Sequence, residues 1–200
     1  MFRPIPVDAG VSHLDPGSFW DYWEQRNIAR YREPYRSYKE ICRRSLDETF
    51  RHFGVRGGDA GLIQRYFDAF PRFTLYPDLA ATLEKLTSRC RLALVSNIDD
   101  DLLAMTPLGR TFDLVCTAER ACGYKPDGRL FRYLIDRAGV ALGEIFHSGQ
   151  SQFTDMVGGK PLGLTIAWIN RRGLRLHPSV PRPDFVFSGL APLASLLGAA

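Results

Sequence analysis

The chain has 200 residues, of which 45% are apolar and 24% charged, and its formal net charge at pH 7 is +4. This length fits one domain, with or without a smaller subdomain, and the composition argues against intrinsic disorder. The positive charge is weak and spread along the chain, so we expect no nucleic acid partner. Its densest part, between Arg26 and Arg56, would suit an anionic small molecule.

The first half of the chain, up to about Leu86, has the periodicity of helices. We expect Ser18 to be the N-cap residue of a helix whose pattern ends at Pro34. Gly54 is expected to stop the second helix. The predicted helices cover residues 18–34, 37–54, 59–70 and 76–89.

From Arg91 onward, short apolar runs alternate with helical stretches. This alternation is typical of βαβ units, so we predict an α/β fold with a Rossmann-like parallel sheet. Ligands of such sheets bind beyond the carboxyl ends of the strands. The expected strands are RLALVS, FDLVCTAE, EIFHSG, TIAWIN and DFVFSG, and the expected helices cover residues 99–108, 129–138, 153–162 and 191–197.

Polar residues follow these strands at three places. Ser96 and Asn97 end the first strand, where a hydroxyl, an amide and free helix N–H groups could bind an anion. Either residue could equally cap the next helix. Lys125 precedes a proline, which cannot continue a strand, so its side chain is expected at the mouth of the sheet. Asp155 lies in the first turn of a helix, where it could favour the helix dipole or neutralise and orient Lys125.

Taken together, these three sites resemble the haloacid dehalogenase (HAD) superfamily, particularly its L-2-haloacid dehalogenase (type II) branch. The resemblance implies that Ser96 contacts an anionic group and that Asn97 matches the asparagine beside it. It implies that Lys125, in its YKP setting, stabilises a charged intermediate, and that Asp155 is the second carboxylate of an acidic motif. It divides the chain into an irregular leader (1–17), a helical cap (18–76) and a Rossmann-like HAD core (77–200).

The resemblance also implies a mechanism. An aspartate at the end of the first strand attacks the substrate carbon, or phosphorus in phosphatase members, and forms a covalent aspartyl intermediate. Lysine and serine stabilise the charge, and water then hydrolyses the ester. The remaining candidates for substrate binding are Gln150, Ser151 and one of two cap arginines, Arg26 or Arg30.

Two positions of the acidic motif depart from the phosphatase pattern. Gln150 stands where phosphatase members have the first of two acidic magnesium ligands, and a single carboxylate is a poor magnesium site. We therefore expect no metal and no cofactor, as in the dehalogenase branch. Against a true dehalogenase, Gln152 and Phe131 stand where that branch commonly has asparagine and tyrosine.

The largest departure lies at the N-terminus, in PIPVDAGVS. Asp8 is a candidate nucleophile, but the spacing to Gly10 is one residue short and no threonine follows. Pro4 and Pro6 lack the N–H groups that a central strand needs. An irregular leader is therefore favoured, and the central first strand is expected to be missing or replaced. Either the chain is a fragment, or residues 1–10 or a partner chain close the sheet, since open edges are costly.

The leading hypothesis is a HAD-like hydrolase of the dehalogenase type that acts on a small anionic organic substrate, inactive if the nucleophile is absent. The alternatives are a non-catalytic anion-binding or interaction protein, and a HAD scaffold repurposed for non-hydrolytic acid/base chemistry with Lys125 and Asp155. With four cysteines in no metal-binding spacing and no signal peptide, we expect buried, reduced thiols and a cytoplasmic location. No membrane partner is expected, and a homodimer is left open.

Overall fold

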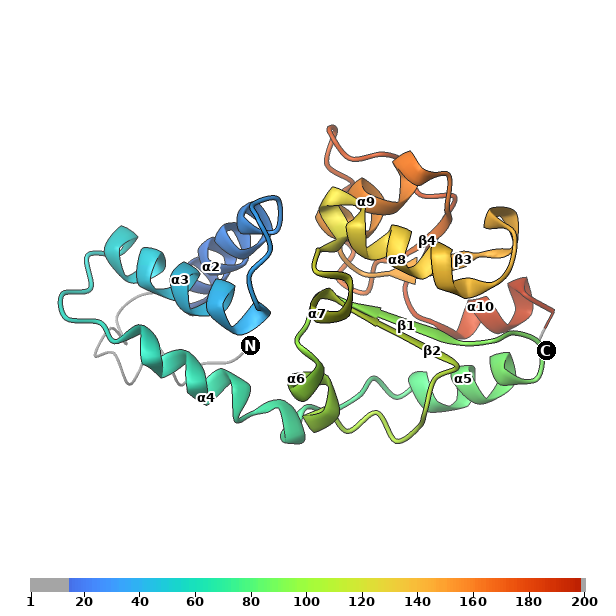
Figure 1. Ribbon diagram of the computed structural model, residues 1–200, viewed down its shortest axis with the longest axis horizontal. Coiled ribbons are helices and arrows are strands. Elements are labelled where there is room, and N and C mark those ends of the chain that lie inside the picture. Colours follow the sequence, from blue (N-terminus) through green and yellow to red (C-terminus); the bar gives the residue numbers. More distant parts are fainter. Residues whose placement is uncertain (1–14, 199–200) are drawn as a thin grey trace. The chain divides into compact units, whose positions relative to one another are not determined.

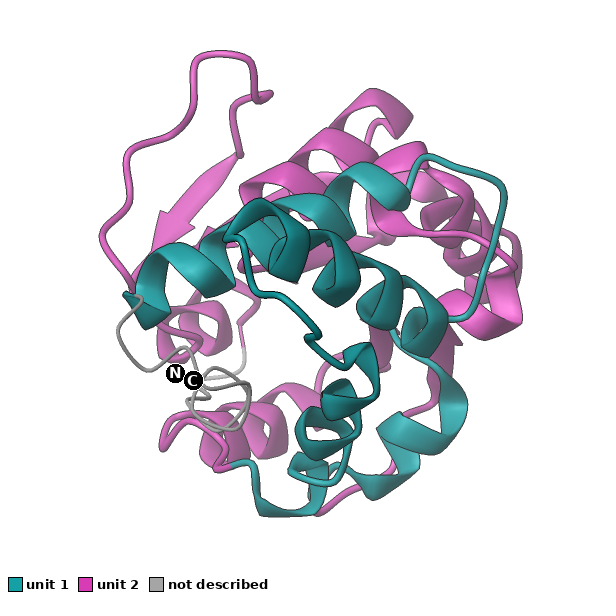
Figure 2. Ribbon diagram, turned by 90° about the vertical axis from the view of Figure 1, so that its left-hand side faces the viewer, with its two compact units in different colours: residues 1–73, 98–107 teal, residues 74–97, 108–200 magenta. Residues whose placement is uncertain are grey.

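The computed structural model describes residues 15–198. The chain divides into two compact units, one formed by residues 1–73 and 98–107 and the other by residues 74–97 and 108–200 (Figure 2). We call them the helical unit and the sheet unit. Among the described residues, no helix combines the length and the apolar character that crossing a membrane requires.

The helical unit is built around two helices that pack against each other, α2 (Pro16–Arg30) and α3 (Tyr38–His52), of 15 residues each. Phe19, Trp20 and Trp23 of α2 are buried, as is Phe50 of α3. The remaining elements are α4 (Gln64–Phe67), α6 (Asp100–Met105) and the 3₁₀ turns η1 (Ala60–Ile63) and η2 (Phe70–Arg72) (Figure 1).

Two expectations for the helical unit are wrong. The N-cap of α2 is Asp15 rather than Ser18, because the Asp15 carboxylate accepts both the N–H and the hydroxyl of Ser18 at 2.8 Å. Pro16 follows in the first helical position, which suits its fixed φ. The single helix predicted over residues 59–70 is broken into η1 and α4, and η2 follows with Pro71 inside it.

The sheet unit contains all five expected strands, all parallel to their neighbours, and the predicted α/β fold class is confirmed. One sheet has the order β1-β2 and the other the order β3-β4-β5. The strands are β1 (Ala93–Ser96), β2 (Leu114–Thr117), β3 (Phe146–Gly149), β4 (Thr165–Ile169) and β5 (Phe185–Phe187).

Helices cover both faces of these sheets, as the alternation along β4 shows. Ile166 and Trp168 pack into the cluster that contains the buried face of α8 (Arg129–Ala138). Ala167 and Ile169 pack into a second cluster with α5 (Leu79–Thr87) and α10 (Ala191–Leu196). Short elements complete the unit: α7 (Ala118–Ala121), η3 (Lys125–Asp127), η4 (Leu142–Glu144), the π-helical turn η5 (Gln152–Met156), α9 (Val157–Gly159) and η6 (Lys160–Leu162).

Among residues 15–198, β1 pairs only with β2 and β3 pairs only with β4, and no described strand takes the place of the family's central first strand. Asp8, Pro4 and Pro6 lie outside the described residues. The cysteines carry no disulfide. Cys42 and Cys116 are buried as expected, whereas Cys90 is half-buried and Cys122, which ends α7 with φ 45°, is exposed.

Candidate functional site

Lys125 is held at the carboxyl end of β1 by hydrogen bonds to Asn97 and Val95. Asn97, which directly follows β1, accepts a hydrogen bond from the Lys125 N–H through its side-chain oxygen at 2.9 Å. Pro126 starts the short turn η3 after Lys125. The Lys125 ammonium then reaches back to the β1 edge and donates to the Val95 carbonyl at 3.3 Å. The predicted placement at the mouth of the sheet therefore has a specific hydrogen-bonded basis.

Asp155 is the partner of Lys125. Its Oδ1 lies 2.9 Å from the Lys125 Nζ, and the side chains are only 3% and 13% exposed. Its Oδ2 accepts the N–H of Ser151 at 2.9 Å. Of the two roles open to Asp155 from the sequence, neutralising and orienting Lys125 is the one that this geometry supports.

His147 is the third member of the site, and the sequence did not single it out. Its Nε2 lies 2.9 Å from the same Asp155 Oδ1. The ring is buried and meets Phe131 edge-on, with the ring centroids 4.9 Å apart. The available signal was a histidine inside the apolar strand EIFHSG, because a buried ionisable side chain needs a partner. We call Lys125, His147 and Asp155 the charged cluster.

The charged cluster controls the ionisation of Asp155. Burial by itself raises the pKa of this carboxyl. The Lys125 ammonium and the His147 hydrogen bond lower the pKa by more than burial raises it, so the pKa of Asp155 lies well below its usual value. The carboxylate is therefore ionised at neutral pH. A fixed anion beside Lys125 in turn holds the ammonium in place.

Two glycines make room for the cluster. A Cβ added at Gly149, the last residue of β3, would collide with the Asp155 carboxylate. A Cβ at Gly158 would collide with the backbone carbonyl of Lys125. The close approach of η5 and α9 to β3 and η3 thus depends on residues without side chains.

The other predicted residues of the sheet unit lie around the cluster in different roles. Ser96 ends β1 and is half-buried. Gln150 is exposed, and its backbone carbonyl accepts the indole N–H of Trp168 at 2.9 Å. Gln152 holds a neighbouring loop. Its side-chain oxygen accepts the His177 N–H, and its side-chain nitrogen donates to the Arg175 carbonyl.

The aspartates after Asn97 do not leave an open helix end. Asp99 accepts the N–H groups of Tyr38 and Lys39 at 2.7 and 3.0 Å, so it binds the first turn of α3. Asp101 pairs with the Lys39 ammonium. These contacts lie wholly within the helical unit.

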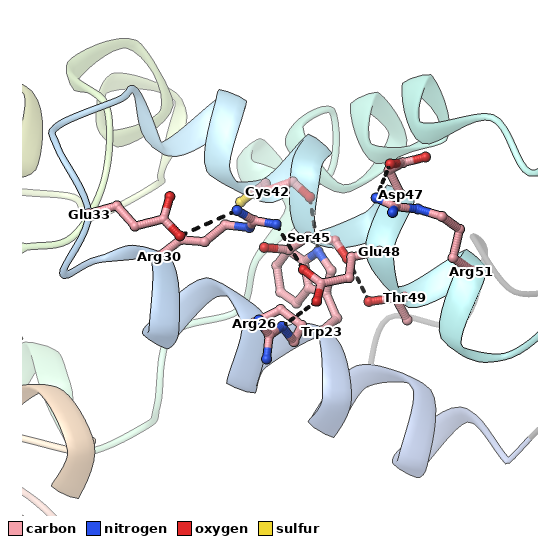
Figure 3. A network of polar contacts seen from close by, with 10 residues as sticks. All are labelled: Trp23, Arg26, Arg30, Glu33, Cys42, Ser45, Asp47, Glu48, Thr49 and Arg51. Carbon is pink, nitrogen blue, oxygen red and sulfur yellow. Dashed lines mark hydrogen bonds and ion pairs between the residues drawn. The ribbon is translucent and has the colours of Figure 1, made fainter.

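Arg26 and Arg30, the two candidate cap arginines, share one carboxylate (Figure 3). Both project from α2 toward Glu48 of α3, with ion-pair distances of 2.9 and 2.8 Å. The structure thus gives both side chains an intramolecular partner, and a role in substrate binding stays a prediction.

The carboxylate oxygens of Asp155 already accept hydrogen bonds from the protein. Residues 15–198 contain no cluster of three His, Cys, Asp or Glu side chains that could hold a metal ion. Magnesium prefers several oxygen ligands in octahedral geometry. Both oxygens of Asp155 already accept donors from Lys125, His147 and Ser151, which a metal would have to displace.

These features define a parallel α/β protein whose charged side chains gather at the carboxyl ends of its strands, where such sheets bind their ligands. A family model described as haloacid dehalogenase-like hydrolase matches residues 25–169. The chain therefore belongs to the haloacid dehalogenase-like hydrolase family, and it is similar to haloacid dehalogenases and to phosphatases.

Individual relatives agree with this assignment. (S)-2-haloacid dehalogenase 4A of Burkholderia cepacia is 34% identical over 118 residues, which are 56% of this chain and 51% of that protein. Phosphoserine phosphatase of Thermus thermophilus is 30% identical over 195 residues, covering 92% of this chain and 76% of the other. A dehalogenase crystal structure with an intermediate complex is 25% identical with a TM-score of 0.79, covering 95% and 88% of the two chains. The chain spans about half the length of the Burkholderia relative.

Proposed function

We propose that this protein hydrolyses a carbon–halogen or related bond in a small anionic organic substrate without a metal ion. The observation that carries this proposal is the charged cluster, in which the Asp155 carboxylate is hydrogen-bonded to Lys125 and His147. Relatedness to a haloacid dehalogenase supports the same chemistry. The ammonium of Lys125 is the positive group that would neutralise a substrate carboxylate or a developing anion.

Asp155 itself is a poor nucleophile and is better assigned as a positioning residue. It is 2% exposed and both of its oxygens are engaged. Among the described residues it is the only carboxylate bonded to Lys125. The attacking carboxylate of our proposal is therefore a residue other than Asp155, and Asp8 is one candidate.

The proposed reaction has two steps. A carboxylate oxygen bonds to the substrate carbon, and the halide leaves with the electron pair of the carbon–halogen bond. Water then attacks the carbonyl carbon of the resulting ester, which restores the carboxylate and releases the hydroxy acid and one proton. Ser96, the last residue of β1, and Ser151, which directly precedes η5, would donate hydrogen bonds to the substrate anion.

Phosphate-ester hydrolysis is the second candidate. It is favoured by the similarity to phosphoserine phosphatase, which extends over 92% of this chain. The engaged oxygens of Asp155 and the glutamine at position 150 weigh against the magnesium that phosphatase members of the resembled family use. We therefore rank it below dehalogenation.

The test compares two substrates. The purified chain is incubated with L-2-chloropropionate and, separately, with O-phosphoserine, each with added magnesium and with EDTA, and halide or phosphate release is measured. We expect halide release that EDTA does not reduce. Magnesium-dependent phosphate release would establish the phosphatase alternative instead. No turnover of either substrate would contradict the hydrolase proposal for this chain.

Two variants separate binding from chemistry. Ser96→Ala should keep the fold and lower the rate of halide release by about 100-fold, as loss of a single anion-stabilising donor does.

Asp8→Asn should abolish turnover if Asp8 supplies the attacking oxygen, and Asp21→Asn on the exposed side of α2 is its control. Unchanged turnover in Asp8→Asn would assign the nucleophile elsewhere.

A further inference from the structure

His147 and Gly149 of β3 both face Asp155. Residues two apart in a strand point to the same side of the sheet. The His147 side chain reaches the carboxylate, with its Nε2 2.9 Å from Oδ1. Gly149 leaves the space that the carboxylate fills, because a Cβ at this position would collide with it. The strand thus offers Asp155 one hydrogen-bonding ring and, two residues further on, the room to approach that ring.

The His147 ring is held by packing as well as by its hydrogen bond. The residue is 8% exposed, and Phe131 of α8 meets its ring at an interplanar angle of 81°. Phe131 is itself fully buried in the apolar cluster that α8 forms with β4. Turning the ring away from Asp155 would leave a cavity beside Phe131, which costs free energy. The ring is therefore fixed in the orientation that points Nε2 at the carboxylate.

The direction of the hydrogen bond between His147 and Asp155 follows from the charge of Asp155. Burial raises the pKa of this carboxyl, but Lys125 and His147 lower it by more, so the group is ionised at neutral pH. An ionised carboxylate has no proton and can only accept hydrogen bonds. The proton between the two side chains therefore belongs to the Nε2 of His147.

The second ring nitrogen of His147 carries no proton by the same reasoning. Its Nδ1 has no hydrogen-bond partner among residues 15–198, and a buried N–H without an acceptor is costly. A proton on both nitrogens would also add an uncompensated positive charge to a buried site in which Lys125 and Asp155 balance each other. The neutral ring with its proton on Nε2 is the form that fits these surroundings.

Lys125 shares the Oδ1 of Asp155 with His147. Two N–H groups of its ammonium are used, by Oδ1 at 2.9 Å and by the Val95 carbonyl at 3.3 Å. An ammonium has three, and the third has no acceptor among the described residues. Because Oδ1 also accepts the His147 N–H, its negative charge is divided between two donors. Lys125 thus keeps part of its positive charge, and one N–H, for an anion at the strand ends.

We propose that His147, as its neutral Nε2–H tautomer, is a positioning residue that holds Asp155 and keeps the Lys125 ammonium partly uncompensated and available to the substrate anion. The inference rests on the proposed function only for the identity of that anion. His147 makes no contact with the substrate, and its proton stays on Nε2 throughout. It acts through Asp155 and Lys125, and what it changes is how tightly the anion binds.

Three substitutions separate this hydrogen bond from the packing of the ring. The amide nitrogen of glutamine reaches about as far as the Nε2 of histidine, so His147→Gln keeps a donor to Asp155. The amide of asparagine takes the place of Nδ1, so His147→Asn cannot reach the carboxylate. His147→Leu fills space without a donor. His177→Gln is the matched control, because the exposed His177 ring of the same unit contacts Ser179 and Phe153 and is not part of the charged cluster.

The first measurement is NMR of the chain at neutral pH, which needs no turnover. Long-range proton–nitrogen correlation spectra distinguish protonated from unprotonated ring nitrogens, and the His147 signals are those lost in His147→Gln. We expect a proton on Nε2 and none on Nδ1. A proton on Nδ1, alone or together with one on Nε2, would overturn the proposal. This result decides the tautomer even where a variant fails to fold.

The nitrogen signal of the Lys125 ammonium, assigned by its loss in Lys125→Arg, shows whether His147 acts on Lys125. The Lys160 signal is the internal reference, because Lys160 pairs with Asp184 instead. We expect the Lys125 signal to shift in His147→Asn and His147→Leu and to stay close to the wild-type position in His147→Gln. The Lys160 signal should not move. Equal Lys125 signals in all three variants, shifted or not, would contradict a role for the Nε2–H donor.

The second measurement is kinetic and uses L-2-chloropropionate. His147→Asn and His147→Leu should raise KM about tenfold with kcat little changed, as loss of a binding interaction does. His147→Gln should rescue most of this loss, and His177→Gln should leave KM unchanged. Loss of folded protein lowers kcat and not KM, so an unchanged KM in His147→Asn would overturn the proposal. If the wild type releases no halide, the proposed hydrolysis fails, and the NMR results still decide the role of His147.

Discussion

The two units of the molecule contain the same arrangement of charges in different surroundings. In the helical unit, Glu48 receives Arg26 and Arg30. In the sheet unit, Asp155 receives Lys125 and His147. The Glu48 side chain is 25% exposed, whereas that of Asp155 is 3% exposed. Each site thus has one carboxylate between two basic side chains, and the degree of burial is what differs.

Burial changes what such an arrangement does. An ion pair in contact with water is screened and contributes about 0–1 kcal/mol. Removing one partner of a buried pair leaves an uncompensated charge and costs about 3–5 kcal/mol. The hydrogen bonds also differ, since the Nε of Arg26 lies 2.9 Å from Glu48 without hydrogen-bond geometry. The cluster around Asp155 should therefore be essential to its unit, and the one around Glu48 should not.

The largest effect is expected for Lys125→Met. Methionine keeps the length of the apolar stem but removes the charge, which leaves Asp155 buried with His147 and one backbone N–H. We expect the free energy of unfolding, measured by urea denaturation at neutral pH, to fall by about 3–5 kcal/mol.

Lys85→Met is the matched control, because Lys85 lies on the exposed side of α5 in the same unit. It should change the free energy of unfolding by less than about 0.5 kcal/mol. Equal losses in the two variants would show that the burial of the Lys125–Asp155 pair has no energetic consequence.

The sequence was sufficient to predict the strands, and it offered the pairing of Lys125 with Asp155 as one of two roles for Asp155. Strand positions follow from apolar runs bounded by polar residues, which are local signals. Lys125 follows β2 and Asp155 follows β3, and a parallel α/β topology brings residues that follow its strands to the same end. Their distance of 2.9 Å, however, depends on glycines 149 and 158, which allow the close approach.

Other features depend on choices that local patterns leave open. Both Asp15 and Ser18 are good N-cap residues, and the chain resolves the choice by making Ser18 a donor to Asp15. Arg26 and Arg30 of α2 pair with Glu48 of α3, and this contact depends on how the two helices pack. His147 was overlooked because its partner lies eight residues away across a turn that includes a π-helical segment.

The second prediction sharpens the comparison through pH. The pKa of Asp155 is lower in the folded chain than its ordinary value near 3.9, so its contribution to stability is present above about pH 4 and is lost as pH falls toward the folded pKa. The difference in unfolding free energy between the wild type and Asp155→Asn should shrink below about pH 4, by at most about 1.4 kcal/mol per pH unit. Urea titrations between about pH 6 and pH 3 measure it. A difference that stays constant over this range would contradict a lowered pKa.

The smallest effect is expected for Glu48→Gln. Glutamine keeps the shape and one acceptor oxygen. Arg30 keeps its ion pair with Glu33, and Arg26 can turn its partly exposed guanidinium group toward water (Figure 3). We expect a loss of about 1 kcal/mol or less in the free energy of unfolding. This loss should become smaller as salt is added, because salt screens partly exposed ion pairs. Asp47→Asn is the control on the same helix, since Asp47 pairs with Arg51 at the surface with its side chain 53% exposed. If Glu48→Gln instead cost as much as Lys125→Met, the two arginines would be held as rigidly as the buried lysine, and burial would not be what separates the two sites.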